Sequence, residues 1–193
     1  MSTIVTSQTK DLVYDWFTER RWTEPEYLLF ANDQNALIEL SDGKVVIHAM
    51  PTPQHQSIVL NIASRLRDHP QGKTFIAPVP IQLWPGKMRE PDVLFYRNEH
   101  LDRVQEQYAG LPDLVIEVLS PSTRSIDLGE KMDEYARAGI PEYWIVEPDA
   151  QNVSAYLLSE NTYQLFARYR SGERVQSASI PELTVQVDQI FAP

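Results

Sequence analysis

Residues 113–119, DLVIEVL, form an apolar run that an aspartate opens and a single glutamate, Glu117, interrupts. A short apolar run bounded by polar residues is typical of a strand that is covered on both faces, as in a parallel or mixed sheet. Helical and extended patterns surround this strand along the chain. The sequence therefore predicts an α/β protein in which helices flank a mixed β-sheet.

The residue patterns on either side of this strand predict the other helices and strands. Helical spacing is found in residues 8–20, 23–31, 53–69 and 127–138. Extended segments are predicted at 35–40, 45–49, 73–84, 89–96, 142–146, 152–158, 163–169 and 183–187, with additional β-hairpins such as the one that turns at 41–44. Residues 98–110 are polar and are predicted to be a loop or partly helical. No repeat or linker divides the chain, so we expect one domain over 1–193 with its core at about 23–187.

The ends of two helices carry recognisable signals. Thr23 and Glu26 have the spacing of a capping box, in which each side chain bonds the other residue's backbone N–H. Asp127 and Glu130 have the same spacing and predict that the fourth helix begins at Asp127. Gly139 predicts where that helix ends, since glycine favours the left-handed conformation that follows a helix.

The composition restricts the function. The chain has 27 acidic and 17 basic residues and a net charge of −10, which disfavours a generic, high-affinity binder of nucleic acid. It has no cysteine, which excludes disulfides and zinc-thiolate sites and fits the cytoplasm. There is no apolar signal segment and no run long enough to cross a bilayer, so no membrane partner is expected. Walker-type loops, nucleophile elbows and dinucleotide fingerprints are also absent from the sequence.

Two acidic residues indicate a metal site. Glu117 lies inside an apolar strand, where a carboxylate needs a cation, a proton or a route to solvent. Asp92 follows Pro91 and opens the apolar segment 93–96. Carboxylates on neighbouring strands can share one Mg²⁺, which prefers oxygen ligands and keeps several waters. The alternatives are a structural ion pair for Glu117 and a strand-start residue for Asp92.

Lys131 is the third candidate. At about 100° per residue, it falls at the edge of the apolar stripe that Leu128, Met132 and Tyr135 form on the predicted helix. Its ammonium can therefore reach the end of the neighbouring strand, where Glu117 lies. The alternative is an amphipathic lysine that buries its stem and keeps its charge in water.

Further candidates carry weaker signals. Glu39 alternates with two apolar neighbours just before the predicted turn; the alternative is the exposed face of a hairpin. His55, near the start of the third helix, is a candidate phosphate or water contact, or else a cap or surface residue. Ser120 and Ser122 either donate hydrogen bonds to phosphate oxygens or cap their loop.

These motifs together resemble a known family. The segments that carry the resemblance are 90–93, 113–123, 131–136 and 139–146. They resemble the Uma-type restriction endonucleases, which are abundant in cyanobacteria and belong to the PD-(D/E)xK nuclease superfamily. The likeness covers about 23–187. It implies a restriction-endonuclease-like fold and hydrolysis of phosphodiester bonds with Mg²⁺, for which Mn²⁺ can substitute.

The resemblance also implies roles for individual residues. Asp92 and Glu117 match the metal ligands, and the backbone carbonyl of Val118 matches a third. The superfamily's lysine, expected two residues after the acid, is absent, because Leu119 stands there. In this family the lysine has moved to the following helix, where this chain has Lys131.

The resemblance and the residues lead to one hypothesis with two rivals. The chain is expected to be a Mg²⁺-dependent endonuclease that acts on nucleic acid, with DNA as the substrate and a homodimer as the assembly. In that reading Glu39 matches the acid that many family members place beside the metal. The first rival is a catalytically silent nuclease fold that binds nucleic acid or protein. The second is a purely structural pair between Glu117 and Lys131.

Overall fold

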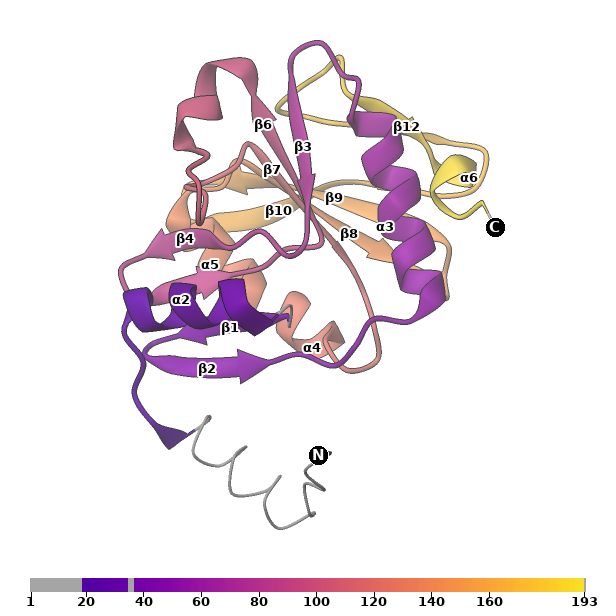
Figure 1. Ribbon diagram of the computed structural model, residues 1–193. Coiled ribbons are helices and arrows are strands. Elements are labelled where there is room, and N and C mark those ends of the chain that lie inside the picture. Colours follow the sequence, from indigo (N-terminus) through magenta and orange to yellow (C-terminus); the bar gives the residue numbers. More distant parts are fainter. Residues whose placement is uncertain (1–18, 35–36, 193) are drawn as a thin grey trace.

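The computed structural model describes residues 19–34 and 37–192, and its centre is a six-stranded sheet (Figure 1). The strand order is β10-β9-β8-β7-β6-β3. β7 and β8 run parallel, and the other neighbours run antiparallel, so the predicted mixed sheet is confirmed. The strands are β3 (Gly72–Ile76), β6 (Val93–Arg97), β7 (Leu114–Val118), β8 (Glu142–Glu147), β9 (Asn152–Ser159) and β10 (Thr162–Tyr169).

Two smaller sheets accompany it. The order β2-β1-β5-β4 defines a four-stranded sheet that contains the predicted hairpin. Its strands are β1 (Ile38–Ser41), β2 (Lys44–Ile47), β4 (Ile81–Trp84) and β5 (Lys87–Arg89), and helix α2 (Glu24–Gln34) contacts it. Near the C-terminus, β11 (Arg174–Gln176) pairs with β12 (Thr184–Gln186), which the short helix α6 (Val187–Ile190) follows. The sequence pattern predicted neither β11 nor α6.

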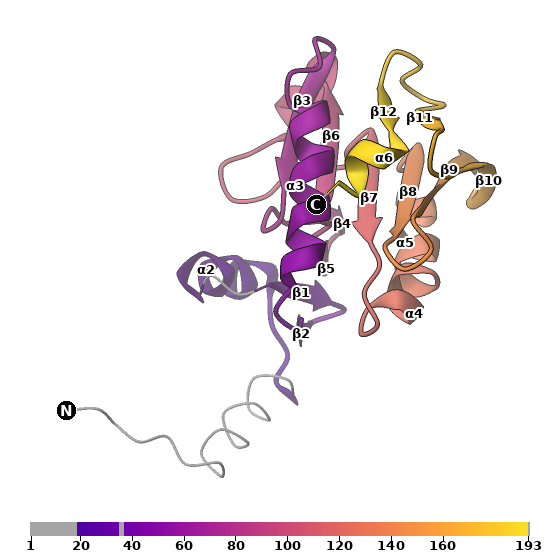
Figure 2. The same cartoon turned by 90° about the vertical axis from the view of Figure 1, so that its right-hand side faces the viewer.

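Helices cover both faces of the large sheet, α3 (Pro53–Leu66) one face and α5 (Glu130–Ala138) the other (Figure 2). Alternate residues of β7 point to opposite faces of the sheet. Ile116 packs with the buried residues of α3, and Val115 packs with Tyr135 of α5. By the same alternation Glu117 points toward α5. Two short helices, η1 (Asn98–Arg103) and α4 (Arg124–Asp127), lie in the connections. Among the described residues, no helix has the length and apolar character needed to cross a bilayer.

Two predicted strands are divided in the structure. The segment 73–84 is not one extended element, because residues 77–80, with two prolines, separate β3 from β4 and send them to different sheets. The segment 89–96 divides at residues 90–92 in the same way, between β5 and β6. Pro91 has no N–H to donate to a ladder, so the chain changes sheets there. The break brings Asp92 to the point where the two sheets meet.

The helix signals were correct in part. Thr23 and Glu26 form the predicted capping box, in which Thr23 N donates to Glu26 Oε2 at 2.9 Å. The predicted start at Asp127 is wrong: α4 ends there, and α5 begins at Glu130 after Gly129, without a side-chain cap. Leu128 lies between these helices and is 38% exposed, so it does not belong to the buried stripe. Gly139 ends α5 with φ at 89°, as predicted. The predicted helix over 8–20 falls almost entirely outside the described residues.

A buried cluster of ions joins the four-stranded sheet to α5. Arg89, at the end of β5, is 2% exposed and contacts three carboxylates. Its guanidinium lies 2.7 Å from Glu39 of β1, 2.7 Å from Glu134 and 2.6 Å from Glu130, both of α5. Lys87 contacts Glu134 as well. Because α5 also carries Lys131, this cluster fixes the position of that lysine.

Replacing Gly72 with alanine is expected to destabilise the fold. A Cβ atom there would lie 2.1 Å from the carbonyl oxygen of Tyr96 and 2.5 Å from the ring of Phe95. We expect Gly72→Ala to lower the free energy of unfolding by about 1–3 kcal/mol, measured by urea denaturation. Gly110→Ala is the control, since its nearest neighbour is at 3.4 Å. Equal stability of the two variants would contradict the close approach of β3 to β6.

Replacing Arg89 with methionine removes the cation of the buried cluster. Glu39 and Glu134 would then keep buried negative charges with fewer partners, and we expect a loss of about 3–5 kcal/mol in the free energy of unfolding. The matched control is Arg67→Met, because Arg67 pairs with Asp68 through side chains that are 76% and 81% exposed. That variant should change stability by less than about 1 kcal/mol. If Arg89→Met unfolds at the same urea concentration as the control, the cluster does not hold α5.

Candidate active site

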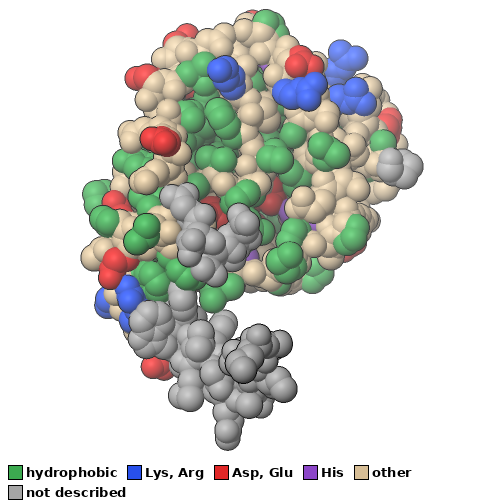
Figure 3. All heavy atoms as spheres, in the orientation of Figure 1, with side chains coloured by type: hydrophobic (Ala, Val, Ile, Leu, Met, Phe, Trp, Pro, Cys, Tyr) green, Lys and Arg blue, Asp and Glu red, His purple; other side chains and the backbone are tan. Residues whose placement is uncertain are grey.

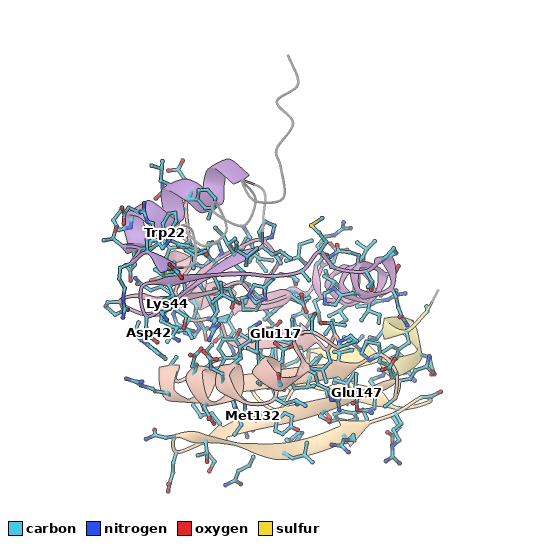
Figure 4. All side chains as sticks on the ribbon, turned by 90° about the horizontal axis from the view of Figure 1, so that it is seen from below. Trp22, Asp42, Lys44, Glu117, Met132 and Glu147 are labelled. Carbon is cyan, nitrogen blue, oxygen red and sulfur yellow. The ribbon has the colours of Figure 1, made fainter. Side chains whose placement is uncertain are left out.

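A cleft of about 690 Å³ lies where the two sheets, the start of α3 and the start of α5 meet. Every residue that the sequence analysis selected lines this cleft: Glu39, His55, Asp92, Glu117, Val118, Ser120, Ser122 and Lys131. Figure 3 shows acidic and histidine side chains in the hollow at the centre of this face, with hydrophobic side chains around them. Figure 4 shows Glu117 in the interior, between the layer of the hairpin and α5.

Glu117 is placed by the pleat of β7 and is 2% exposed. Its Oε1 accepts hydrogen bonds from Lys131 Nζ at 2.8 Å and from the Tyr135 hydroxyl at 2.9 Å. Its Oε2 lies on the other side and accepts a weaker bond from the Asp92 N–H at 3.3 Å. The two oxygens therefore face different partners, one toward the lysine and the other toward Asp92.

Asp92 stands directly before β6, beside the end of β7. Its Oδ2 accepts a hydrogen bond from the Val118 N–H at 2.8 Å. The same oxygen lies 3.1 Å from Nε2 of His55, and that nitrogen also lies 3.1 Å from the Val118 carbonyl oxygen. The Asp92 carboxylate, the Glu117 carboxylate and the Val118 carbonyl are thus brought together, as the sequence analysis expected.

Lys131 reaches the site from the first turn of α5, and its side chain is only 5% exposed. Besides Glu117, its ammonium lies 3.2 Å from Asp127 Oδ1 and 3.5 Å from Glu39 Oε1. From the sequence, Asp127 was interpreted only as a helix cap, so this contact was not predicted. The spacing of four residues between Asp127 and Lys131 was the available signal, since residues so spaced can form an ion pair on a helix.

Glu39 is 1% exposed, so the alternative of an exposed hairpin face is wrong. The side of β1 that carries Glu39 packs toward Arg89, and Nε2 of His48 lies 2.9 Å from Glu39 Oε2. The backbone N–H of Glu90 also donates to this carboxylate at 3.1 Å. A local pattern in the sequence cannot show this burial, because Arg89 comes from a different strand of the sheet.

The two serines occupy the loop after β7. The hydroxyls of Ser120 and Ser122 lie 3.0 Å apart, and Ser120 Oγ accepts a hydrogen bond from the Thr123 N–H at 3.2 Å. Ser120 therefore caps its own loop, one of the two roles considered. Both residues also line the cleft.

The site holds more negative than positive charge. Burial raises the pKa of Glu117, and although Lys131 opposes the shift, the Asp127 and Asp92 carboxylates add to it. Burial likewise raises the pKa of Asp127. Burial would also raise the pKa of Glu39, but Lys131, His48 and Arg89 hold it well below its usual value. The ammonium of Lys131 is thus shared by three carboxylates, and a further cation would relieve the excess negative charge.

The donor atoms suit a divalent cation that keeps part of its water shell. In the described ranges, 19–34 and 37–192, no group of three or more acidic or histidine side chains is placed to hold a metal ion. The open set consists of Asp92, Glu117 Oε2 and the Val118 carbonyl, which are hard oxygen donors. Mg²⁺ and Mn²⁺ accept such partial sets, because water or substrate oxygens complete the coordination. The residues therefore fit the metal that the resemblance implies.

Comparisons with known proteins show what this chain is similar to. The model of the Uma2 family, described as "Putative restriction endonuclease", matches residues 24–188. The uncharacterized protein slr1290 of Synechocystis sp. (strain ATCC 27184 / PCC 6803 / Kazusa) is 27% identical over 171 residues, which cover 86% of this chain and 89% of that protein.

A solved structure shares the fold. The crystal structure of "a putative nuclease belonging to DUF820 from Anabaena variabilis ATCC 29413" superposes with a TM-score of 0.67 at 20% sequence identity. The match covers 88% of this chain and 97% of the other. The structural neighbour shows the shared fold, and the family model supports a nuclease function. Since the family model spans most of the sequence, this chain belongs to the Uma2 family of nuclease-like proteins, as its motifs indicated.

Proposed function

We propose that this protein is a metal-dependent endonuclease that hydrolyses phosphodiester bonds in DNA. The observation that carries the proposal is the convergence of Asp92, Glu117, the Val118 carbonyl and Lys131 in one cleft. The groups come from three separate segments of the sequence, yet all lie within a chain of direct contacts. Such a set of carboxylates and one lysine is suited to phosphoryl transfer to water.

The metal would be held by Asp92, by Glu117 through Oε2, and by the Val118 carbonyl. Mg²⁺ is the proposed ion, with Mn²⁺ as a substitute. A divalent cation bound there supplies Lewis acidity toward a phosphoryl oxygen and toward the attacking water. The protein's part is to hold these oxygens in place, which the hydrogen bond from the Val118 N–H to Asp92 does.

Lys131 acts in this proposal as a fixed cation. Burial would lower its pKa, but Glu117, Glu39 and Asp127 raise it well above the ordinary value. An ammonium that stays charged cannot take a proton from water, so a general-base role is excluded for it. It can orient a water by donating a hydrogen bond and can stabilise negative charge that develops on the phosphate. Glu39, whose Oε1 lies 3.5 Å from the ammonium, helps to position it.

The substrate must approach an acidic protein. Among the described residues, the only lysine or arginine side chains that line the cleft are Lys131 and Arg124, and Arg124 pairs with Glu147. Affinity for DNA therefore depends on the metal ion, which turns the carboxylates into a phosphate-binding site. Cutting of both strands is best served by a two-fold homodimer with one site for each strand. The cysteine-free chain suits action in the cytoplasm.

The alternative is a catalytically silent nuclease fold that binds nucleic acid or protein. The observation that favours it is that Glu117 Oε1 already accepts hydrogen bonds from Lys131 and Tyr135. In that case the buried pair would be structural only. The two readings differ in whether the cleft takes up metal and in whether DNA is cut.

Cleavage of supercoiled plasmid tests the proposal. We expect cutting with Mg²⁺ or Mn²⁺, none with EDTA, and a loss of about 10²–10³-fold in rate for Asp92→Asn and for Lys131→Met, because each variant removes one stabiliser of the transition state. Asp133→Asn is the matched control, since Asp133 is exposed on α5 and does not line the cleft. Activity that survives both site substitutions would exclude the mechanism.

Thermal unfolding tests the metal site without substrate. A ligand that binds only the folded state at 100 times its Kd stabilises it by about 2.7 kcal/mol, so Mn²⁺ is expected to raise the Tm of the wild type. Asp92→Asn should abolish the increase, and Asp133→Asn should keep it. A Tm that millimolar Mn²⁺ leaves unchanged in the wild type would favour the silent alternative.

A further inference from the structure

The cleft carries an ion pair at its opening, between Arg124 and Glu147. Arg124 is the first residue of α4, and Glu147 is the last residue of β8. Nη2 of the guanidinium lies 2.5 Å from Oε1 of the carboxylate, and both residues line the cleft. The arginine side chain is 52% exposed and the glutamate side chain 23%. A ligand that enters the cleft from solvent therefore meets this pair.

The pair lies at the carboxyl ends of the two parallel strands, β7 and β8. Val118 and Val146 are partners in the register of these strands, and the Leu119 N–H donates to the Val146 carbonyl at 2.9 Å. Glu147 follows Val146 directly, and Arg124 follows the loop that leaves β7. Ligands of open α/β sheets bind outside the carboxyl ends of parallel strands. Arg124 thus comes from the same strand end that presents the Val118 carbonyl to the proposed metal.

The two partners are held unequally. Asn152 of β9 is buried and donates to Glu147 Oε2 at 3.2 Å, so the carboxylate keeps a hydrogen bond if the guanidinium leaves. Within the described ranges, Glu147 is the one acidic partner of the Arg124 side chain. An exposed ion pair contributes little to stability, because water screens it. Arg124 can therefore leave Glu147 at small cost while Glu147 stays in place.

A DNA phosphate is a suitable new partner for this guanidinium. Arginine forms two parallel hydrogen bonds with a phosphate, a geometry that a lysine cannot match. Of the lysine and arginine side chains that line the described part of the cleft, Lys131 is buried and shared by three carboxylates. That leaves Arg124 to contact a phosphate outside the metal site. Glu147 opposes the contact, because it attracts the guanidinium and repels the phosphate.

We propose that Arg124 binds a DNA phosphate at the mouth of the cleft, and that Glu147 competes with the DNA for it. This inference rests on the proposed function, because it concerns how DNA reaches the same site. In the free protein Arg124 neutralises Glu147. In the complex Arg124 turns to the phosphate, while Asn152 holds the carboxylate. The ion pair thereby limits the affinity for DNA.

Two substitutions should change DNA binding in opposite directions. Arg124→Met removes the phosphate contact and should reduce the slope of log affinity against log salt concentration by about one. The advantage of the wild type over this variant should therefore fall about three- to fourfold between about 50 and 200 mM salt. Glu147→Gln frees Arg124, keeps an acceptor for Asn152, and should raise the affinity by up to about fivefold.

A double variant and a second ion pair are the controls. When Arg124→Met is already present, Glu147→Gln should change the affinity by less than about twofold, because the two substitutions act on one contact. The matched pair is Arg67 and Asp68, whose side chains are exposed and do not line the cleft. Arg67→Met and Asp68→Asn make the same changes of charge there. Both should leave the affinity and the salt slope as in the wild type.

Fluorescence anisotropy of a short labelled DNA duplex with the full chain measures the binding. Ca²⁺ replaces Mg²⁺, because it also takes oxygen ligands, and a gel checks that the duplex stays intact. Equal salt slopes for the wild type and Arg124→Met would overturn the inference. Weaker binding by Glu147→Gln would also overturn it, because the pair would then support the shape of the cleft. An equal gain from Glu147→Gln in the double variant would show long-range repulsion instead and overturn it too.

Plasmid cutting with Mg²⁺ separates this inference from the proposed function. If the wild type still cuts plasmid, each of these three results removes the role of Arg124 and leaves the endonuclease proposal standing. A wild type that does not bind the duplex overturns the inference, and one that also fails to cut plasmid overturns both.

Discussion

The buried ammonium of Lys131 is the interaction on which the rest of this structure depends. It contacts Glu117 from the six-stranded sheet, Glu39 from the four-stranded sheet and Asp127 from the short helix α4. A cation out of water is stable only when several partners replace its hydration. The two sheets and the helices must therefore pack around this point. The same requirement places Glu117 beside Asp92 and leaves an open cleft at the junction.

Arg89 has a related role between the four-stranded sheet and α5. Its guanidinium holds Glu39 against α5, so that Glu39 is ionised and aimed at Lys131. The two cations and their carboxylates form one connected set, in which each charge depends on the others. When no ion is bound, their excess of negative charge disfavours the folded state. A divalent ion would remove part of that penalty. Natural proteins often accept such costs at functional sites.

The sequence allowed the main strand and its acid to be predicted, because an apolar run shows burial and Glu117 breaks it. Helical periodicity also predicted that Lys131 reaches this acid, and the distance of 2.8 Å agrees. The burial of Glu39 was not predictable, since it depends on Arg89 from another strand. Asp127 was interpreted as a cap, because local capping and distant ion pairing use the same residue type. The break at Pro91 was read as a strand start, and it also moves the chain to another sheet.

A crystal structure of the protein with Mn²⁺, with the metal located by anomalous scattering, tests the central claim most directly. The account predicts one ion at about 2.0–2.3 Å from the carboxylates of Asp92 and Glu117 and from the carbonyl of Val118, with Lys131 still bonded to Glu117 Oε1. At saturating Mn²⁺, a cleft without an ion, or an ion held only by surface carboxylates, would contradict it.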